Sequence, residues 1–72
     1  MRFVLRDARS NRIIHTYMAE GPALAFVRDV VRVAGREEAA RFILEVEDER
    51  GHTRLSAEGQ ALVRRALEDR VL

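Results

Sequence analysis

Alternating apolar and polar positions at the start of the chain predict a β-hairpin. In the stretch RFVLRDA (residues 2–8), Phe3 and Leu5 occupy every second position, as in a strand with one buried face. The tripeptide RSN at residues 9–11 supplies turn-forming side chains. The following stretch, RIIHTYMA at residues 12–19, is rich in β-branched and aromatic side chains and predicts the returning strand.

The next segment has the periodicity of an amphipathic helix. Gly21 can serve as its N-cap, and Pro22 fits the first helical position because its missing N–H costs nothing there. Gly35 suits the position just after the last helical residue. At 100° per residue, the apolar side chains gather on one half of the helix. They are Ala23, Leu24, Phe26, Val27, Val30, Val31, Val33 and Ala34.

Residues 36–51, REEAARFILEVEDERG, give conflicting signals. Glu, Ala, Arg and Leu are good helix formers, but Phe42, Leu44 and Val46 alternate as in a strand. We predict a strand from about 41 to 47, with Phe3, Leu5 and these three side chains facing the helices. A turn through Asp48–Gly51 then leads to a short return strand, HTRLSA.

The C-terminal stretch EGQALVRRALEDRVL predicts a second helix. Its apolar stripe consists of Leu62, Val63, Ala66 and Leu67.

Two segments of the chain recur. RFVL at residues 2–5 returns as RFIL at 41–44, an offset of 39, and AEGPAL at 19–24 returns as AEGQAL at 57–62, an offset of 38. Such similarity suggests an internal duplication of a strand–strand–helix unit. The apolar stripe of the second helix matches the first at an offset of 36 instead, so either the second helix is rotated about its axis or the similarity is a coincidence.

These elements predict an α+β fold in the order β-β-α-β-β-α, with a four-stranded, mainly antiparallel sheet and two helices packed on one face. A chain of 72 residues forms one domain, here residues 1–72. Residues 1–35 form its first strand–strand–helix unit and residues 40–72 its second. With 47% apolar residues, it can build a single thin core but hardly a deep pocket as well.

The chain contains, in order, a hairpin, a helix, an acidic turn and a final segment that share a set of characteristic residues. They are Ala23, Leu24, Val27, Arg28, Val31, Gly35, Glu47, Asp48, Leu55, Ala57, Gly59, Leu62, Arg65 and Ala66. In this order the segments resemble a group of short uncharacterised strand-strand-helix proteins from high-GC bacteria, which share a hairpin, a helix of the type EAL..VR..V...G, an acidic turn and a final IA.G..L..RA segment. The chain has Leu55 and Ser56 where an Ile-Ala pair is commoner, and the resemblance implies no activity.

Catalytic and metal-binding chemistry has little support in the sequence. The chain has no cysteine, and its two histidines, His15 and His52, lack the i, i+4 spacing that places two ligands on one helix face. The hydroxyl side chains fit turns and strands, and the glycines form no phosphate-binding loop. We therefore expect no enzyme, no cofactor and no metal site.

The leftover apolar surface is the strongest indication of function. If the helices cover one face of the sheet, the opposite face carries Val4, Ile13, Tyr17 and Ile43, with Ile14 near them. The outer face of an antiparallel sheet is usually polar, so a half-apolar one suggests a partner, and symmetric self-pairing is the commonest arrangement. Scattered surface aliphatic residues, which are ordinary in proteins, are the competing explanation. We predict a protein-interaction module that pairs with itself, with another protein as the alternative partner.

Nucleic-acid binding is the alternative function. All thirteen basic residues are arginine, but the net charge of +1 is too small for long-range attraction. The first hairpin and the last helix could contact phosphates through Arg6, Arg9, Arg12, Arg64 and Arg65. No apolar run approaches the length of a membrane span, so no membrane partner is expected, and the cytoplasm is the expected location.

Overall fold

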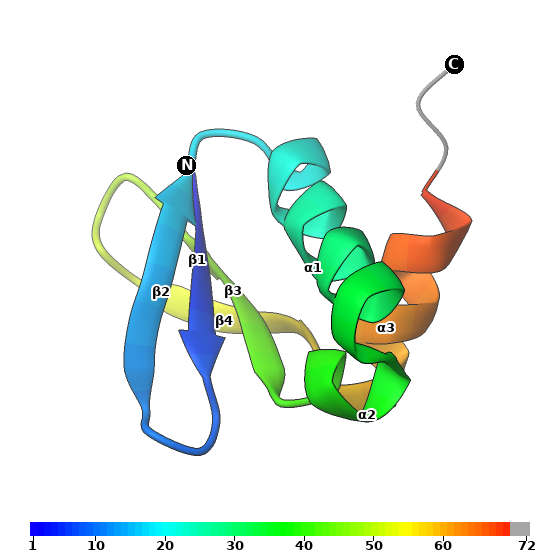
Figure 1. Ribbon diagram of the computed structural model, residues 1–72. Coiled ribbons are helices and arrows are strands. Elements are labelled where there is room, and N and C mark those ends of the chain that lie inside the picture. Colours follow the sequence, from blue (N-terminus) through cyan, green and yellow to red (C-terminus); the bar gives the residue numbers. More distant parts are fainter. Residues whose placement is uncertain (70–72) are drawn as a thin grey trace.

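The computed structural model describes residues 1–69 and confirms the α+β fold (Figure 1). The final residues of the predicted second helix, 70–72, lie outside the described residues. The strands are β1 (Arg2–Asp7), β2 (Arg12–Tyr17), β3 (Phe42–Glu47) and β4 (Thr53–Glu58). The helices are α1 (Glu20–Ala34), α2 (Arg36–Ala39) and α3 (Gly59–Glu68). The short helix α2 was not predicted.

The four strands form one antiparallel sheet in the order β2-β1-β3-β4. Its two central strands are β1 and β3, which begin the two hairpins, and β2 and β4 form its edges. The extended conformation of Phe42–Glu47 confirms the strand predicted for the ambiguous segment. Alternation outweighs helical propensity here because it places Phe42 and Leu44 in the core. The predicted turn at Asp48–Gly51 is also confirmed.

The core lies between the sheet and the helices, which all pack on the same side of it (Figure 1). Leu5 and Leu44 stand directly opposite each other on β1 and β3, and both are fully buried. From the helices, the buried side chains are Ala23, Leu24 and Val27 on α1, Ala39 on α2, and Leu62, Val63 and Ala66 on α3. Burying this apolar surface is the main source of stability in so small a chain.

Each edge strand contains one β-bulge, and neither was predicted. Ile14 is the extra residue in β2, because Leu5 pairs with His15 while Arg6 pairs with Ile13. Ser56 is the extra residue in β4. The first bulge shifts the alternation of β2, so His15 and Tyr17 face the helices while Ile13 faces away from them. The expectation that Ile13 and Tyr17 share a face is therefore wrong.

The first helix begins earlier than predicted. Its N-cap is Ala19 rather than Gly21, and Pro22 lies within the first turn, where a missing N–H is still tolerated. Gly35 ends the helix as predicted, with a φ of 94° and its N–H donating to the Val31 carbonyl oxygen over 2.9 Å. The predicted apolar stripe is too wide, since Val33 is 83% exposed.

The second helix buries three of its four predicted stripe residues. Leu62, Val63 and Ala66 lie in the core, whereas Leu67 is exposed at its margin. The structure also gives the spacing that relates the two helices. Residues 23, 24 and 27 are buried on α1 and residues 62, 63 and 66 on α3, which is an offset of 39.

Candidate functional site

The most exposed element of the sheet is the edge strand β2. Five of its six residues are exposed and only Tyr17 is half-buried. Ile13 is 55% exposed, and Ile14 is also exposed. His15 is exposed although it faces the helix layer, so the helices leave the middle of this strand uncovered. An edge strand also presents unpaired backbone N–H and C=O groups, which can pair with another strand.

The outer face of the sheet differs from the expected apolar surface. Val4 at its centre is only 5% exposed, although it lies outside the core cluster. Ion pairs cross from β1 to β3 on both sides of Val4. Arg6 Nε donates to Glu45 Oε1 over 3.0 Å, and Arg2 pairs with Glu47. The aliphatic stems of such long side chains shield the strand between them.

The four predicted interface residues therefore do not form one surface. Val4 is buried and Ile43 is half-buried, so neither offers much area to a partner. Tyr17 lies on the opposite face and packs against the core, because the bulge at Ile14 changes which side it faces. Only Ile13 is exposed where it was expected. Exposed apolar surface therefore lies at the β2 edge and not at the middle of the sheet, where it was predicted.

The helix-facing side of β2 carries two aromatic rings in contact. The ring centroids of His15 and Tyr17 lie 4.6 Å apart with an interplanar angle of 60°, an edge-to-face geometry that is favourable for aromatic pairs. Burial raises the pKa of the Tyr17 phenol above its ordinary value of 10.0. The phenol therefore remains neutral and can act as a hydrogen-bond donor at physiological pH.

The predicted nucleic-acid contacts do not form a basic patch. Arg6 and Arg9 pair with Glu45 and Glu38, each over 3.0 Å. Arg65 Nη1 donates to Glu20 Oε2 over 3.2 Å and to Ser56 Oγ over 2.7 Å.

The remaining two predicted contacts, Arg12 and Arg64, are both exposed, but one lies on the edge strand and the other in the helix layer. Nearby carboxylates would compete with phosphate for the paired arginines. Nucleic-acid binding stays a prediction that this arrangement does not favour.

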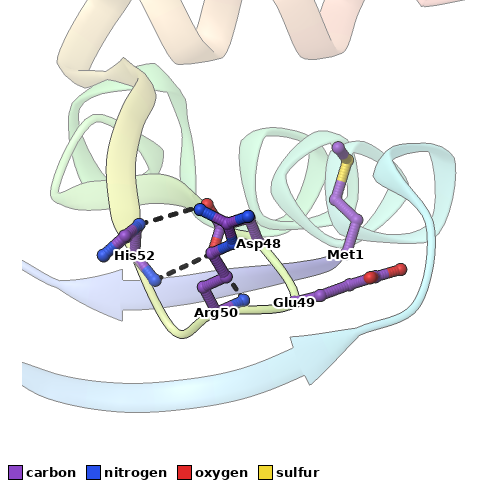
Figure 2. A pocket seen from close by; sticks show the side chains of 5 residues that line it. All are labelled: Met1, Asp48, Glu49, Arg50 and His52. Atoms are coloured by element: carbon purple, nitrogen blue, oxygen red, sulfur yellow. Dashed lines mark hydrogen bonds and ion pairs between the residues drawn. The ribbon is translucent and has the colours of Figure 1, made fainter.

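A shallow hollow of about 400 Å³ lies beside the β3–β4 turn, lined by Met1, Asp48, Glu49, Arg50 and His52 (Figure 2). Asp48 Oδ1 accepts hydrogen bonds from the backbone N–H groups of Arg50 and His52, each over 2.9 Å. His52 Nδ1 lies 3.5 Å from Asp48 Oδ2. These contacts close the turn, as aspartate side chains commonly do. They supply hydrogen-bond partners for the Asp48 carboxylate, so its position does not indicate a bound ligand.

A metal-binding or membrane role gains no support from the described part of the chain. Residues 1–69 contain no group of three or more His, Cys, Asp or Glu side chains that could hold a metal ion. Within the same residues, no helix is both long enough and apolar enough to cross a membrane.

Two exposed apolar sites were missed by sequence reasoning. Leu55 on the other edge strand, β4, is 55% exposed. On α1, a shallow hollow of about 350 Å³ is lined by Phe26, Asp29, Val30, Val33 and Ala34. The width of the apolar stripe on this helix could have indicated surplus apolar surface, since one helix face buries only what its neighbours can cover.

No protein-family model, no curated protein and no solved structure matches the chain. The resemblance to short proteins of high-GC bacteria therefore stays a prediction.

Proposed function

We propose that the protein is a small non-enzymatic interaction module that associates with a second copy of itself. The observation that carries this proposal is the exposure of β2, whose isoleucines lie at an unpaired sheet edge. A six-residue strand rich in β-branched side chains gains little by facing water on both sides. A partner would bury Ile13 and Ile14 and satisfy the backbone groups of the edge.

Self-association suits this surface because the most common oligomers are two-fold symmetric dimers, in which one patch meets its own copy. A small core also benefits from added burial, since a chain of this size buries a limited part of its surface alone. We further propose a cytoplasmic location, in keeping with a chain that uses no disulfide bonds.

An internal duplication would fit the same tendency to self-pair, and we include it in the proposal. It is supported by three features that share the offset of 39. They are the buried helix positions, the first helical residues Glu20 and Gly59, and the bulge sites opposite Leu5/Arg6 and Leu44/Glu45. On this view, β1 and β3 pair within one chain as two identical units would pair across a two-fold axis. Leu5 and Leu44 lie at the centre of that contact.

Light scattering coupled to size-exclusion chromatography tests self-association. At micromolar concentration we expect a particle with twice the 8.3 kDa mass of one chain, which dissociates on dilution. A particle of 8.3 kDa at all micromolar concentrations would rule out the proposed dimer.

A further inference from the structure

We propose that the second copy pairs with the edge of β2 in antiparallel orientation, so that the sheets of both copies become continuous. This inference rests on the proposed self-association and specifies its geometry. The two strands overlap completely when Arg12 of one copy lies opposite Tyr17 of the other and Ile13 lies opposite Thr16. This register uses all six residues of β2.

The bulge at Ile14 makes this register geometrically consistent. In a regular strand, side chains alternate between the two faces, so the first and last of six residues lie on opposite faces. In β2, Arg12 pairs with Asp7 and Tyr17 pairs with Phe3, and both Asp7 and Phe3 lie on the helix-facing side of β1. Directly opposed residues of an antiparallel pair share a face. Full overlap therefore places the helices of both copies on the same side of the joined sheet.

The placement of charge along β2 favours a second copy as the occupant. Arg12 is the only residue of β2 that carries a permanent charge, and in the proposed register it lies opposite Tyr17 rather than another arginine. A guanidinium near a tyrosine ring gains a cation–π interaction. On the other face, Ile13 meets the methyl-bearing side chain of Thr16, which is a favourable cross-strand pair.

The helix layer leaves room for the partner strand. His15 faces the helices yet is exposed, so the helices do not cover the middle of β2, and a strand placed about 4.8 Å beyond it lies farther from them still. The second edge, β4, is less suited to this pairing. It carries Arg54 and Glu58, and charged side chains are a common protection of sheet edges.

Paired charge substitutions test the register by sedimentation velocity. The double variant Ile13→Lys/Thr16→Lys places lysines opposite each other, about 5 Å apart between Cβ atoms, across the proposed contact. We expect its dimer dissociation constant to rise by about tenfold or more. Ile13→Lys/Thr16→Glu places opposite charges together and should recover most of the loss. The matched control is Leu55→Lys on β4, because Leu55 and Ile13 are each 55% exposed, and it should leave dimerisation unchanged.

Cysteine crosslinking provides an independent test, because the natural chain has no cysteine. An equimolar mixture of Ile13→Cys and Thr16→Cys chains should form the mixed disulfide faster than either disulfide between identical chains. Opposed positions in this register have Cβ atoms about 4.5–5.5 Å apart, so a small backbone adjustment brings them to the roughly 3.5–4.5 Å of a disulfide.

The outcomes separate this inference from the proposed function. A wild-type protein that is monomeric throughout overturns both. A dimer that survives the lysine pair, or that dissociates with Leu55→Lys instead, overturns the β2 geometry while self-association stands. Circular dichroism of each variant identifies any that fails to fold, and in that case the crosslinking result decides.

Discussion

The two strand–strand–helix units begin alike and differ in how they connect the hairpin to its helix. In the first unit Leu5 pairs with His15, ten positions later, and α1 begins five residues after that, at Glu20. In the second unit Leu44 pairs with Ala57, thirteen positions later, and α3 begins two residues after that, at Gly59. The separation from Leu5 to Glu20 therefore equals the separation from Leu44 to Gly59. The second unit has the longer turn and the shorter link to its helix.

This difference explains why the helix layer covers β4 at Ala57 but leaves β2 open at His15. A two-residue link holds the start of α3 close to β4, and Ala57 is buried beneath it. A five-residue link lets α1 begin beyond the end of β2, and His15, which occupies the equivalent pairing position, stays exposed. The distribution of residues between hairpin and link therefore determines how far the helix layer covers each edge strand.

The strongest test of the comparison removes one leucine from each unit at the centre of the sheet. Leu5→Ala and Leu44→Ala should each lower the free energy of unfolding by about 2–5 kcal/mol, because both side chains are fully buried and each change leaves a cavity. Urea denaturation followed by circular dichroism measures both. Since the two residues are directly opposed, we expect losses that agree within about 1 kcal/mol. A much smaller loss for Leu5→Ala would show that the first unit is the weaker half of the core.

The pattern of apolar residues was sufficient to predict the sheet and most of the core. Alternation at Phe42 and Leu44 identified the third strand against its helical propensity, because burial on one sheet face outweighs intrinsic preference. Gly35 marked the end of α1 correctly because a positive φ favours glycine. The apolar stripe of the second helix was also mostly correct.

The position of the exposed surface could not be predicted in the same way. A β-bulge adds one residue without changing composition, so nothing in the sequence revealed that Tyr17 and Ile13 lie on opposite faces. Val4 is buried between two ion pairs that join β1 to β3. Those pairs require the strand register, which a single sequence leaves open.

Ala57 on β4 and His15 on β2 occupy equivalent pairing positions. Substitutions at these two residues test how far the helices cover each edge strand. Ala57→Leu inserts three carbon atoms beneath α3 and should cost about 1–3 kcal/mol through overpacking. His15→Leu should change stability by less than about 0.5 kcal/mol, because the site is exposed. Thermal unfolding of both variants gives the comparison. Equal losses would mean that the helices cover the two strands equally, against the proposed difference.

The short link in the second unit also requires a left-handed residue. Gly59 has a φ of 60°, whereas Glu20, the first residue of α1, is not glycine and lacks a positive φ. Gly59→Ala should lower the free energy of unfolding by about 1 kcal/mol, since its Cβ would disfavour this conformation. The added Cβ would lie 3.9 Å from the Ala40 carbonyl oxygen, an ordinary contact, so the loss would be conformational rather than steric.

Gly21→Ala is the matched control for that change. Gly21 lies in the first turn of α1 with open space around it and without a positive φ, so alanine should leave stability unchanged or raise it by up to about 0.5–1 kcal/mol. Chemical denaturation should therefore show a loss of stability for Gly59→Ala and none for Gly21→Ala. A loss at both positions would indicate that glycine is needed for flexibility in both units alike.

The smallest expected effect concerns the ion pair that joins the turn of the first hairpin to α2. Arg9 Nη2 donates to Glu38 Oε1 over 3.0 Å, and Arg41 Nη1 donates to Glu38 Oε2 over 2.6 Å. The hydrogen bond and charge of Arg9, supported by Arg41, hold the pKa of Glu38 below its ordinary value of 4.5. A carboxylate with a lowered pKa stabilises the fold above its ordinary pKa, and this contribution is lost as the pH falls through the lowered value.

Glu38→Gln should therefore lower the melting temperature slightly at neutral pH, and the difference from wild type should shrink as the pH falls below 4.5, the ordinary value. The effect is small because the carboxylate is well exposed and solvent screens the pair. Glu37→Gln, at the neighbouring exposed position of the same short helix, is the matched control and should leave the melting temperature at neutral pH unchanged. Calorimetry from neutral to acidic pH checks both variants. A gap for Glu38→Gln that stays constant at acidic pH would assign the loss to packing instead of charge, and the contact between the first hairpin and α2 would then be independent of ionisation.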